Sequence, residues 1–289
     1  MMTEKELLLD VRGLSVGFAS YNARLEKIVY QAIAHMDIKL YRGEIMAIVG
    51  SSGSGKSLLA HAIMNILPDN AIVGGEIYYK GSILDKRRQR ELAGKELAFI
   101  PQSVAYLDPL MRVGEQVRGI RGDAVRGLQE QAFKHYNLRP GTERLYPFQL
   151  SGGMARRVLL STAFVTDAEL VIADEPTPGL DLKIAVEALK DFRVMADSGK
   201  GVILITHDID LALNVADKIA IFHDGRVVET AETRCFSGDG SGLRHPYSRA
   251  LFMALPQNGF VLQRCPKCGA SSAVWAVDGQ EMRCECEHA

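Results

Sequence analysis

A chain of 289 residues, of which 47% are hydrophobic, is long enough for one large domain or two modest ones and has ample material for a packed core. The chain has 34 Lys and Arg residues and 35 Asp and Glu residues, which gives a formal net charge of -1. It therefore lacks the excess of basic residues that would indicate nucleic acid as a partner. The apolar runs, such as "IMAIVG" and "GVILIT", are far too short to span a bilayer, and the N-terminus lacks the basic-then-apolar order of a signal peptide. We therefore expect a cytoplasmic chain whose five cysteines are thiols or metal ligands rather than disulfides.

The first part of the chain has the pattern of strands around one helix. Residues 7–18 and 32–40 alternate in polarity like strands of an antiparallel sheet. Next come "GEIMAIVG", a continuous apolar strand that ends in glycine, and a helix over 56–67 that Pro68 closes. A turn and another strand follow over 74–84. This part is therefore expected to combine an antiparallel sheet with a buried strand–helix unit.

The second part of the chain changes from helices to buried strands. From about 103 to 165 the pattern is helical, with loops rich in Gly and Pro. Two strongly apolar runs, "AELVIADEP" and "GVILITHD", are separated by a helix over about 182–198, which predicts parallel strands in an α/β core. "KIAIFHDGRVVET" predicts a hairpin with Asp224 and Gly225 at its turn. After Phe236 we expect a loop or linker, a short helix and a tail that holds four of the five cysteines.

The stretch "GSSGSGKS", from Gly50 to Ser57, fits the pattern G-x-x-x-x-G-K-[ST] in full and lies between a predicted strand and a predicted helix. In this arrangement backbone N–H groups cradle phosphate oxygens, because the small side chains leave those groups open. Lys56 supplies a mobile positive charge to the β- and γ-phosphates, and the Ser57 hydroxyl can ligate Mg²⁺. The pattern and its context together predict a site for a nucleoside triphosphate.

Three polar residues follow the two later apolar runs. Asp174 ends the first run and is placed to hold Mg²⁺ through water, as the strand acid does in P-loop NTPases. Glu175, the next residue, could polarise an attacking water as a general base. His207 ends the second run, at the edge where ligands bind in parallel sheets, and can contact a γ-phosphate.

The stretch "QLSGGMAR", residues 149–156, indicates a second anion site. Its Ser can cap a helix, and its two glycines let backbone N–H groups approach a ligand closely. A helix N-terminus of this kind can bind phosphate. On these residues alone, an ordinary capped helix is the simpler interpretation.

As a set, these motifs resemble the nucleotide-binding subunit of an ATP-binding cassette (ABC) transporter. The motifs occur in the family's order and spacing over roughly residues 7–235. They are Phe18 for the aromatic that stacks on adenine, "GSSGSGKS" for Walker A, Gln102 in "FIPQS" for the Q-loop, "LSGGM" for the signature, "LVIADEP" for Walker B, Asp181 in "GLD" for the D-loop, and His207 for the switch histidine. The family usually has Gln where this chain has Met154, and that difference leaves the contacts assigned to the Ser and the glycines untouched.

The resemblance implies a set of functional residues. Glu175, His207 and Gln102 are implied in catalysis, and Mg²⁺ is implied at Ser57, Gln102 and Asp174. The residues implied in ATP binding are Phe18, Gly50, Ser51, Gly53, Ser54, Gly55, Lys56, Ser57, Leu58, Ser151, Gly152, Gly153 and Asp181. In this family two subunits meet head to tail with two ATP molecules between them, so the signature residues would bind the γ-phosphate of ATP held on the partner's loop.

The resemblance also implies the architecture. We expect an α/β fold: a P-loop NTPase core with an antiparallel β subdomain and a helical subdomain at about 103–165, plus a short extension that contains cysteines. The expected ATPase domain covers 1–235, and the expected C-terminal extension covers 236–289.

Three further stretches resemble one branch of the family. "QSVAYLDPLMRVGEQV", "YPFQLSGGM" and "HPYSRALFMALP" are similar to segments of the ATPases of peptide and nickel importers. The resemblance implies an ATPase subunit at the cytoplasmic face of the membrane that drives import of oligopeptides, dipeptides, nickel or a similar small solute. Its implied partners are a second ATPase subunit, identical or different, two membrane permease subunits and an external solute-binding protein, with no nucleic acid.

Two other functions remain open from the sequence. One is a soluble ABC protein of DNA repair or translation, although the long coiled-coil insertions or tandem cassettes usual in that class are not visible. The other is an accessory ATPase of a C–P lyase complex, which resembles this branch closely.

The tail over 265–289 contains a C-x-x-C pair, Cys265 and Cys268, and a C-x-C pair, Cys284 and Cys286. Four thiolates in a short segment suit Zn²⁺ or an iron–sulfur cluster. Some relatives in the peptide-importer branch have a four-cysteine cluster site after the "HPY" segment, but the spacing here departs from theirs. Free cysteines are the alternative, and Cys235 is expected to be an ordinary thiol.

Overall fold

The computed structural model describes residues 5–21, 25–51, 53–255, 258, 276–277 and 280–281. The chain divides into two compact units, Met1–Thr230 and Ala231–Ala289, and each is described by itself. The boundaries expected for the ATPase domain and the extension, at residues 235 and 236, stay a prediction, because compactness alone does not tell which unit carries an activity.

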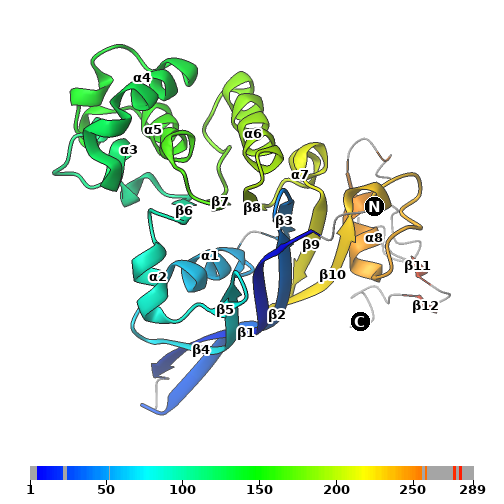
Figure 1. The fold of residues 1–289 in the computed structure, drawn as a ribbon. Coiled ribbons are helices and arrows are strands. Elements are labelled where there is room, and N and C mark those ends of the chain that lie inside the picture. Colours follow the sequence, from blue (N-terminus) through cyan, green and yellow to red (C-terminus); the bar gives the residue numbers. More distant parts are fainter. Residues whose placement is uncertain are drawn as a thin grey trace. The chain divides into compact units, whose positions relative to one another are not determined.

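A parallel sheet forms the centre of the first unit (Figure 1). Its strands are β3 (Ile45–Val49), β6 (Leu97–Ile100), β7 (Leu170–Asp174), β8 (Gly201–Thr206) and β9 (Lys218–His223), in the order β9-β3-β8-β7-β6. Each neighbouring pair runs parallel. All residues of β3, β7 and β8 are buried, which explains why their sequences are unbroken apolar runs. The predicted α/β core is therefore confirmed.

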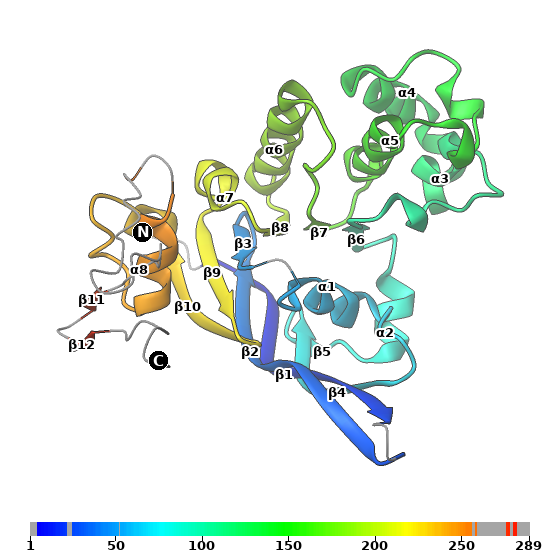
Figure 2. The same cartoon turned by 180° about the vertical axis from the view of Figure 1, so that it is seen from behind.

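Helices cover both faces of this sheet. The helices are α1 (Lys56–Met64), α6 (Leu182–Asp197) and α7 (Ile209–Val215), and Figures 1 and 2 place α6 and α7 on one face and α1 on the other. The α6 helix begins where Asp181 accepts a hydrogen bond from the N–H of Ile184, as expected for an N-cap aspartate. The α1 helix ends before the predicted Pro68, because Asn65 adopts the left-handed conformation (φ 54°) that stops a helix.

An antiparallel layer continues the sheet beyond β9. It consists of β1 (Leu7–Tyr21), β2 (Lys27–Tyr41), β4 (Ala71–Tyr79) and β5 (Ser82–Ile83), and β5 is followed in the chain by α2 (Lys86–Leu92). The start of β10 (Arg226–Glu232) lies between β9 and β2 and pairs with β2 in parallel. Antiparallel pairing joins β1 to β2 and to β4, which confirms the predicted strands. The β9–β10 turn has Asp224 at φ 47° and Gly225 at φ 71°, the two positive angles that a tight hairpin turn requires.

The helical part of the first unit lies beyond the edge strand β6 (Figure 1). It contains α3 (Val113–Arg118), α4 (Arg126–His135) and α5 (Gly152–Val165), with short 3₁₀ turns η1 (Val104–Tyr106), η2 (Gly119–Val125), η3 (Thr142–Arg144) and η4 (Pro147–Gln149). Both predicted accessory parts, antiparallel and helical, are thus present beside the α/β core.

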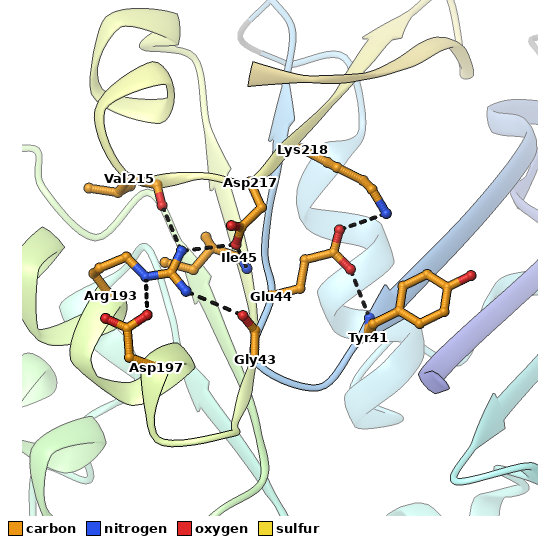
Figure 3. Close-up of polar contacts among 9 residues, drawn as sticks. All are labelled: Tyr41, Gly43, Glu44, Ile45, Arg193, Asp197, Val215, Asp217 and Lys218. Carbon is orange, nitrogen blue, oxygen red and sulfur yellow. Dashed lines mark hydrogen bonds and ion pairs between the residues drawn. The ribbon is translucent and has the colours of Figure 1, made fainter. Parts of the chain in front are cut away.

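Charged side chains hold the amino ends of the parallel strands together (Figure 3). Arg193 of α6 donates to Asp217 at 2.9 Å, and Asp217 accepts from the N–H of Ile45 at 2.8 Å, at the first residue of β3. Glu44, only 1% exposed, forms an ion pair with Lys218 at 2.8 Å. These contacts fix the position of the first residues of β3. They therefore also fix the position of the loop that follows the other end of β3.

The second unit contains η5 (Thr233–Cys235), α8 (Pro246–Met253) and the short strands β11 (Ala276–Val277) and β12 (Gln280–Glu281). The α8 helix confirms the short helix predicted after the loop over 237–242. Phe236 packs edge-to-face on Phe252, with ring centroids 6.0 Å apart. The four tail cysteines lie outside the described residues, and no described helix is both long and apolar enough to cross a membrane.

Candidate nucleotide site

Four segments predicted to carry chemistry leave the sheet at one edge. In the parallel register Val49 of β3 lies beside Thr206 of β8, and Asp174 of β7 lies beside Ile205. The residues after β3, β6, β7 and β8 therefore emerge together at the carboxyl edge, where ligands bind in parallel sheets.

The loop between β3 and α1 needs its glycines. A Cβ on Gly50 would lie 2.2 Å from the carbonyl oxygen of Phe222, closer than any real contact. Gly55 has φ 101° just before α1, and a Cβ there would meet the carbonyl oxygen of Ala32 at 3.0 Å. No side chain caps the N-terminus of α1, so its first N–H groups remain available to an anion.

Lys56 is folded back onto this loop. Its side chain is buried, and Nζ donates to the carbonyl oxygens of Gly50 at 3.0 Å and Ser51 at 2.7 Å and to Ser54 Oγ at 3.4 Å. Burial lowers the pKa of Lys56, while the nearby carboxylates Asp174 and Glu175 oppose that shift. Among the described residues, the hydrogen-bond acceptors of this amine are neutral oxygens, and the anionic oxygens of a phosphate would be stronger acceptors.

Asp174 ends β7 beside this loop. Its side chain is 2% exposed, and burial raises its pKa although the Ser57 hydroxyl donates a hydrogen bond to it. Among the described residues, Asp174 Oδ1 is buried without a hydrogen-bond partner. The Ser57 hydroxyl and the Asp174 carboxylate, with its unpartnered buried oxygen, suit Mg²⁺, which prefers oxygen ligands.

Glu175 and His207 meet, as their places at the edge predict. His207 Nδ1 lies 2.8 Å from Glu175 Oε1, and Glu175 Oε2 is buried with no partner in the described part of the chain. The backbone of Glu175 has φ 45°, a conformation that non-glycine residues rarely adopt and that the surrounding structure must enforce. Because the His207 side chain is 53% exposed whereas that of Glu175 is 8% exposed, the pair joins a solvent-facing group to a buried carboxylate.

The "LSGGM" stretch forms a separate surface. Ser151 caps α5, with Oγ accepting from the N–H of Met154 at 3.3 Å, and the Ser151 and Gly152 residues are exposed. In the described part of the chain, no hydrogen bond joins these residues to the loop 50–58. Asp181 caps α6 and pairs with Arg157 of α5 at 2.8 Å, which ties α5 to the segment before α6.

Comparison with known proteins identifies the family to which the chain belongs. Residues 33–178 match the family model described as ABC transporter. The chain is 33% identical over 267 residues to the oligopeptide transport ATP-binding protein OppD of Bacillus subtilis, with 86% of this chain and 72% of OppD covered. The chain belongs to the ABC transporter family. The dipeptide transport ATP-binding protein DppD of Bacillus subtilis is also similar, at 32% identity over 273 residues, with 87% of this chain and 78% of DppD covered.

Solved structures have the same fold. The dimeric structure of MJ0796, a bacterial ABC transporter cassette, covers 78% of this chain and 99% of its own, with a TM-score of 0.67 and 24% identity. The structure of an ATP binding subunit of an ABC transporter has a TM-score of 0.64 at 26% identity, with 79% of this chain and 91% of that one covered. The chain is therefore an ABC-type ATPase built on the cassette fold.

Two residues assigned to nucleotide binding in this ABC cassette pack against its apolar core. Phe18 and Leu58 are half-buried against the apolar core. Directly across the β1–β2 pair from Phe18 stands Tyr30, which is 69% exposed. Tyr30 lines a cavity of about 390 Å³ together with Ser51, Gly53 and Ser54 of the loop. An aromatic ring beside the phosphate loop is thus provided by a residue that the sequence pattern did not single out.

Arg156 is the second residue that the motifs did not single out. It lies on the apolar side of α5, is only 4% exposed, and donates to the carbonyl oxygen of Gln102 at 2.6 Å, whereas the Gln102 residue itself is exposed. The position of Arg156 in the sequence could have indicated its burial. It stands three and four residues before the buried Leu159 and Leu160, so in a helix the arginine lies on the same, buried face.

The described residues contain no group of three or more His, Cys, Asp or Glu side chains that could hold a metal ion by themselves. Cys265, Cys268, Cys284 and Cys286 lie outside those residues, so zinc or an iron–sulfur cluster there stays a prediction.

Proposed function

We propose that the chain couples ATP binding and hydrolysis to the import of oligopeptides or dipeptides. The observation that carries this proposal is its similarity to OppD and DppD, named for oligopeptide and dipeptide transport, over more than two thirds of their lengths. Neither name supports nickel as the solute, or a role in DNA repair, translation or a C–P lyase complex. Peptides are therefore the solute class of this proposal.

The triphosphate of ATP binds on the loop Gly50–Ser57 and the start of α1. Lys56 exchanges its neutral loop acceptors for phosphate oxygens, and the N–H groups before and at the uncapped helix N-terminus supply further donors. Ser57, Gln102 and Asp174 would hold Mg²⁺, which supplies charge neutralisation on the phosphates when bound. The base lies toward the β1–β2 pair, where Phe18 supports the strand and Tyr30 presents its exposed ring.

Glu175 is the general base of hydrolysis in this proposal. Its Oε1 is held by His207, and its buried Oε2 is free to accept a proton from the attacking water. His207 orients the carboxylate and, being exposed, reaches the γ-phosphate. The unusual backbone angle of Glu175 aims the side chain at the site.

The signature surface completes the site of a second subunit. Ser151, Gly152 and Gly153 at the N-terminus of α5 bind the γ-phosphate of ATP on the partner's loop, and Asp181 lies at the same interface. The partner is a second ATPase subunit, identical or different. Two permease subunits and an external solute-binding protein complete the importer, which places the chain at the cytoplasmic face of the membrane.

Transport in reconstituted vesicles tests the peptide proposal. The chain is assembled with candidate permease and binding-protein subunits, and ATP-dependent uptake of mixed dipeptides and oligopeptides is compared with uptake of nickel. We expect peptide uptake that disappears in a Lys56→Ala variant. Uptake of nickel without uptake of peptides would show that the proposed solute class is wrong. The absence of any permease partner would refute the proposal that the chain is part of an importer.

We also propose that the cysteine tail binds one metal centre per chain. Thiolates bind metal only when deprotonated, and binding then supplies folding free energy to a segment with few apolar residues. Elemental analysis of anaerobically purified protein should find zinc, or iron with sulfide, at one centre per chain. Changing Cys265 and Cys284 to Ser should remove that metal and leave the ATPase active, whereas substoichiometric metal in the unchanged chain would refute the site.

A further inference from the structure

Arg156 is a buried cation without an acidic partner in the described part of the chain. Its guanidinium donates only to backbone carbonyl oxygens. The acceptors are Pro101 at 2.7 Å, Gln102 at 2.6 Å, Pro176 at 3.1 Å and Asp174 at 3.5 Å. A buried charge is costly unless it is fully hydrogen-bonded, so this contact set is specific to a forked, permanently charged group.

The acceptors belong to two segments that carry proposed functional residues. Pro101 and Gln102 follow β6 in the Q-loop, and Asp174 and Pro176 stand on either side of Glu175. Arg156 itself is in the second turn of α5, the helix whose N-terminus carries the signature residues. One side chain therefore joins the signature helix, the Q-loop and the end of β7.

The contacts flank the strained residue of the site. Glu175 keeps its φ of 45° only if its neighbours hold it, and Arg156 binds a carbonyl on each side of it. The hydrogen bond from the Glu175 N–H to Ile205 at 2.9 Å is a third restraint. Loss of the guanidinium would remove two of these restraints at once.

We propose that Arg156 is a positioning residue that sets Glu175 and Gln102 relative to the signature helix. It does not touch ATP or water in this proposal, and its effect passes through the backbone that it binds. The inference rests on the proposed role of Glu175 as general base. It adds a link by which movement of the Q-loop displaces the catalytic carboxylate and α5 together.

Shape and charge both restrict what can replace Arg156. Lys offers one ammonium group and cannot span carbonyls on two segments as the planar fork does. Met has similar length and no donors, so it removes all four hydrogen bonds with little change in apolar volume. We therefore expect the order Arg, Lys, Met in function as well as in the number of bonds retained.

Arg121, in η2, provides a matched control because it contacts the other end of the same helix. It is a partly buried arginine that donates to the carbonyl oxygen of Val165, at the other end of α5, and pairs with Asp167 at 2.8 Å. Its removal weakens the attachment of α5 without touching the Q-loop or Glu175. A general loosening of the helix would therefore appear in Arg121→Met as well as in Arg156→Met.

The test measures kcat, KM for ATP and Tm in Arg156→Met, Arg156→Lys and Arg121→Met, each assembled with its partner subunits. We expect Arg156→Met to lower kcat by about 10-fold to 100-fold, because small misplacements of catalytic groups have effects of that size, with KM changed less than about threefold. Arg156→Lys should recover part of kcat, and Arg121→Met should lower Tm while kcat per folded chain stays within about twofold.

Two outcomes overturn the proposal: kcat of Arg156→Met within about twofold of the unchanged protein, or Lys no better than Met while both proteins are folded. If Arg156→Met fails to fold, Arg156→Lys decides alone, and unchanged kcat in that variant refutes the proposal. A parallel Glu175→Gln variant separates the two claims. If it hydrolyses ATP normally, the general base is wrong; if it is inactive while Arg156→Met is normal, the positioning role alone fails.

Discussion

The two ends of the parallel sheet use polar groups in opposite ways. At the amino end, Arg193 pairs with Asp217, and the buried Glu44 pairs with Lys218 (Figure 3). At the carboxyl end, Asp174 Oδ1 is buried without a partner in the described structure, and burial raises the pKa of that carboxyl. At the amino end, the charged groups pair with one another and support the fold. At the carboxyl end, a charged oxygen remains available to bind a ligand.

Strand β7 shows the contrast within a few residues. Glu169, just before the strand, pairs with Lys80 at 2.6 Å and with Arg42, and the Lys80 hydrogen bond is the main cause that lowers its pKa. Asp174, at the other end of the strand, has its pKa raised by burial. The amino-end charge therefore stabilises the folded state, and the carboxyl-end charge destabilises it. The sheet maintains this unfavourable charge where function needs it.

The largest expected effect is on hydrolysis at the carboxyl end. Glu175→Gln keeps the shape and the contact with His207 but removes the base, so hydrolysis should fall by about 10²-fold to 10⁴-fold while ATP still binds. The variant should also accumulate as an ATP-bound dimer, because the closed state no longer reopens by hydrolysis. Steady-state hydrolysis and size-exclusion chromatography with ATP check this, and normal turnover would remove Glu175 from the role.

Asp174→Asn should separate stability from activity at the same end. Replacing a buried, incompletely partnered carboxylate by a neutral amide should raise Tm at neutral pH in the absence of nucleotide. Hydrolysis with Mg²⁺ should be lost, since a ligand of the ion is gone. A scan of Tm with an activity assay measures both, and a lower Tm would show that Asp174 supports the fold instead.

Arg193→Met should have the reverse effect at the amino end. It removes the hydrogen bonds to Asp217, Asp197 and the carbonyl of Gly43, and because these groups are partly exposed we expect a loss of about 1–2 kcal/mol. That corresponds to a decrease in Tm of several degrees, with kcat per folded chain unchanged. Loss of kcat without loss of Tm would contradict the division between the two ends.

The smallest effect concerns pH. Because the pKa of Glu169 is lowered below 4.5 in the folded chain, its pairing stabilises fully above that value and is lost as pH falls through the folded pKa. Glu169→Gln should therefore lower stability at neutral pH by less than about 1 kcal/mol and flatten its acid dependence. Urea unfolding at neutral and acidic pH measures this, and an equal loss at both would exclude linkage through Glu169.

The sequence predicts those helices and strands whose hydrophobic pattern is contained in one continuous segment of sufficient length. The strand–loop–helix unit around Gly50–Ser57 combines a buried apolar run with a full motif, and β7 and β8 are runs of five and six buried residues. The edge strand β6 has four residues, and the helices α2 and α7 have seven each, so their patterns are too short to stand out.

The two residues that the motifs did not single out, Tyr30 and Arg156, depend on distant parts of the chain. In the sequence, Arg156 is a charged residue within an apolar helical pattern. Its burial is explained only by the carbonyl oxygens that it binds at Pro176 and Pro101, which lie 20 and 55 residues away in the chain. Tyr30 lies where β2 extends beyond the predicted strand at 32–40, and only the pairing with β1 brings it opposite Phe18. Which of the two rings is exposed is a property of packing that strand alternation does not determine.

The shift in Tm caused by Mg·ATP tests the central claim most directly: the carboxyl edge binds nucleotide, and the amino edge supports the fold. At a concentration of about 100 times Kd, binding should stabilise the unchanged chain by about 2.7 kcal/mol. We predict that Arg193→Met starts from a lower Tm and keeps this shift, whereas Lys56→Ala starts near the unchanged Tm and loses it. A full shift in Lys56→Ala, or its loss in Arg193→Met, would contradict this division between the two edges.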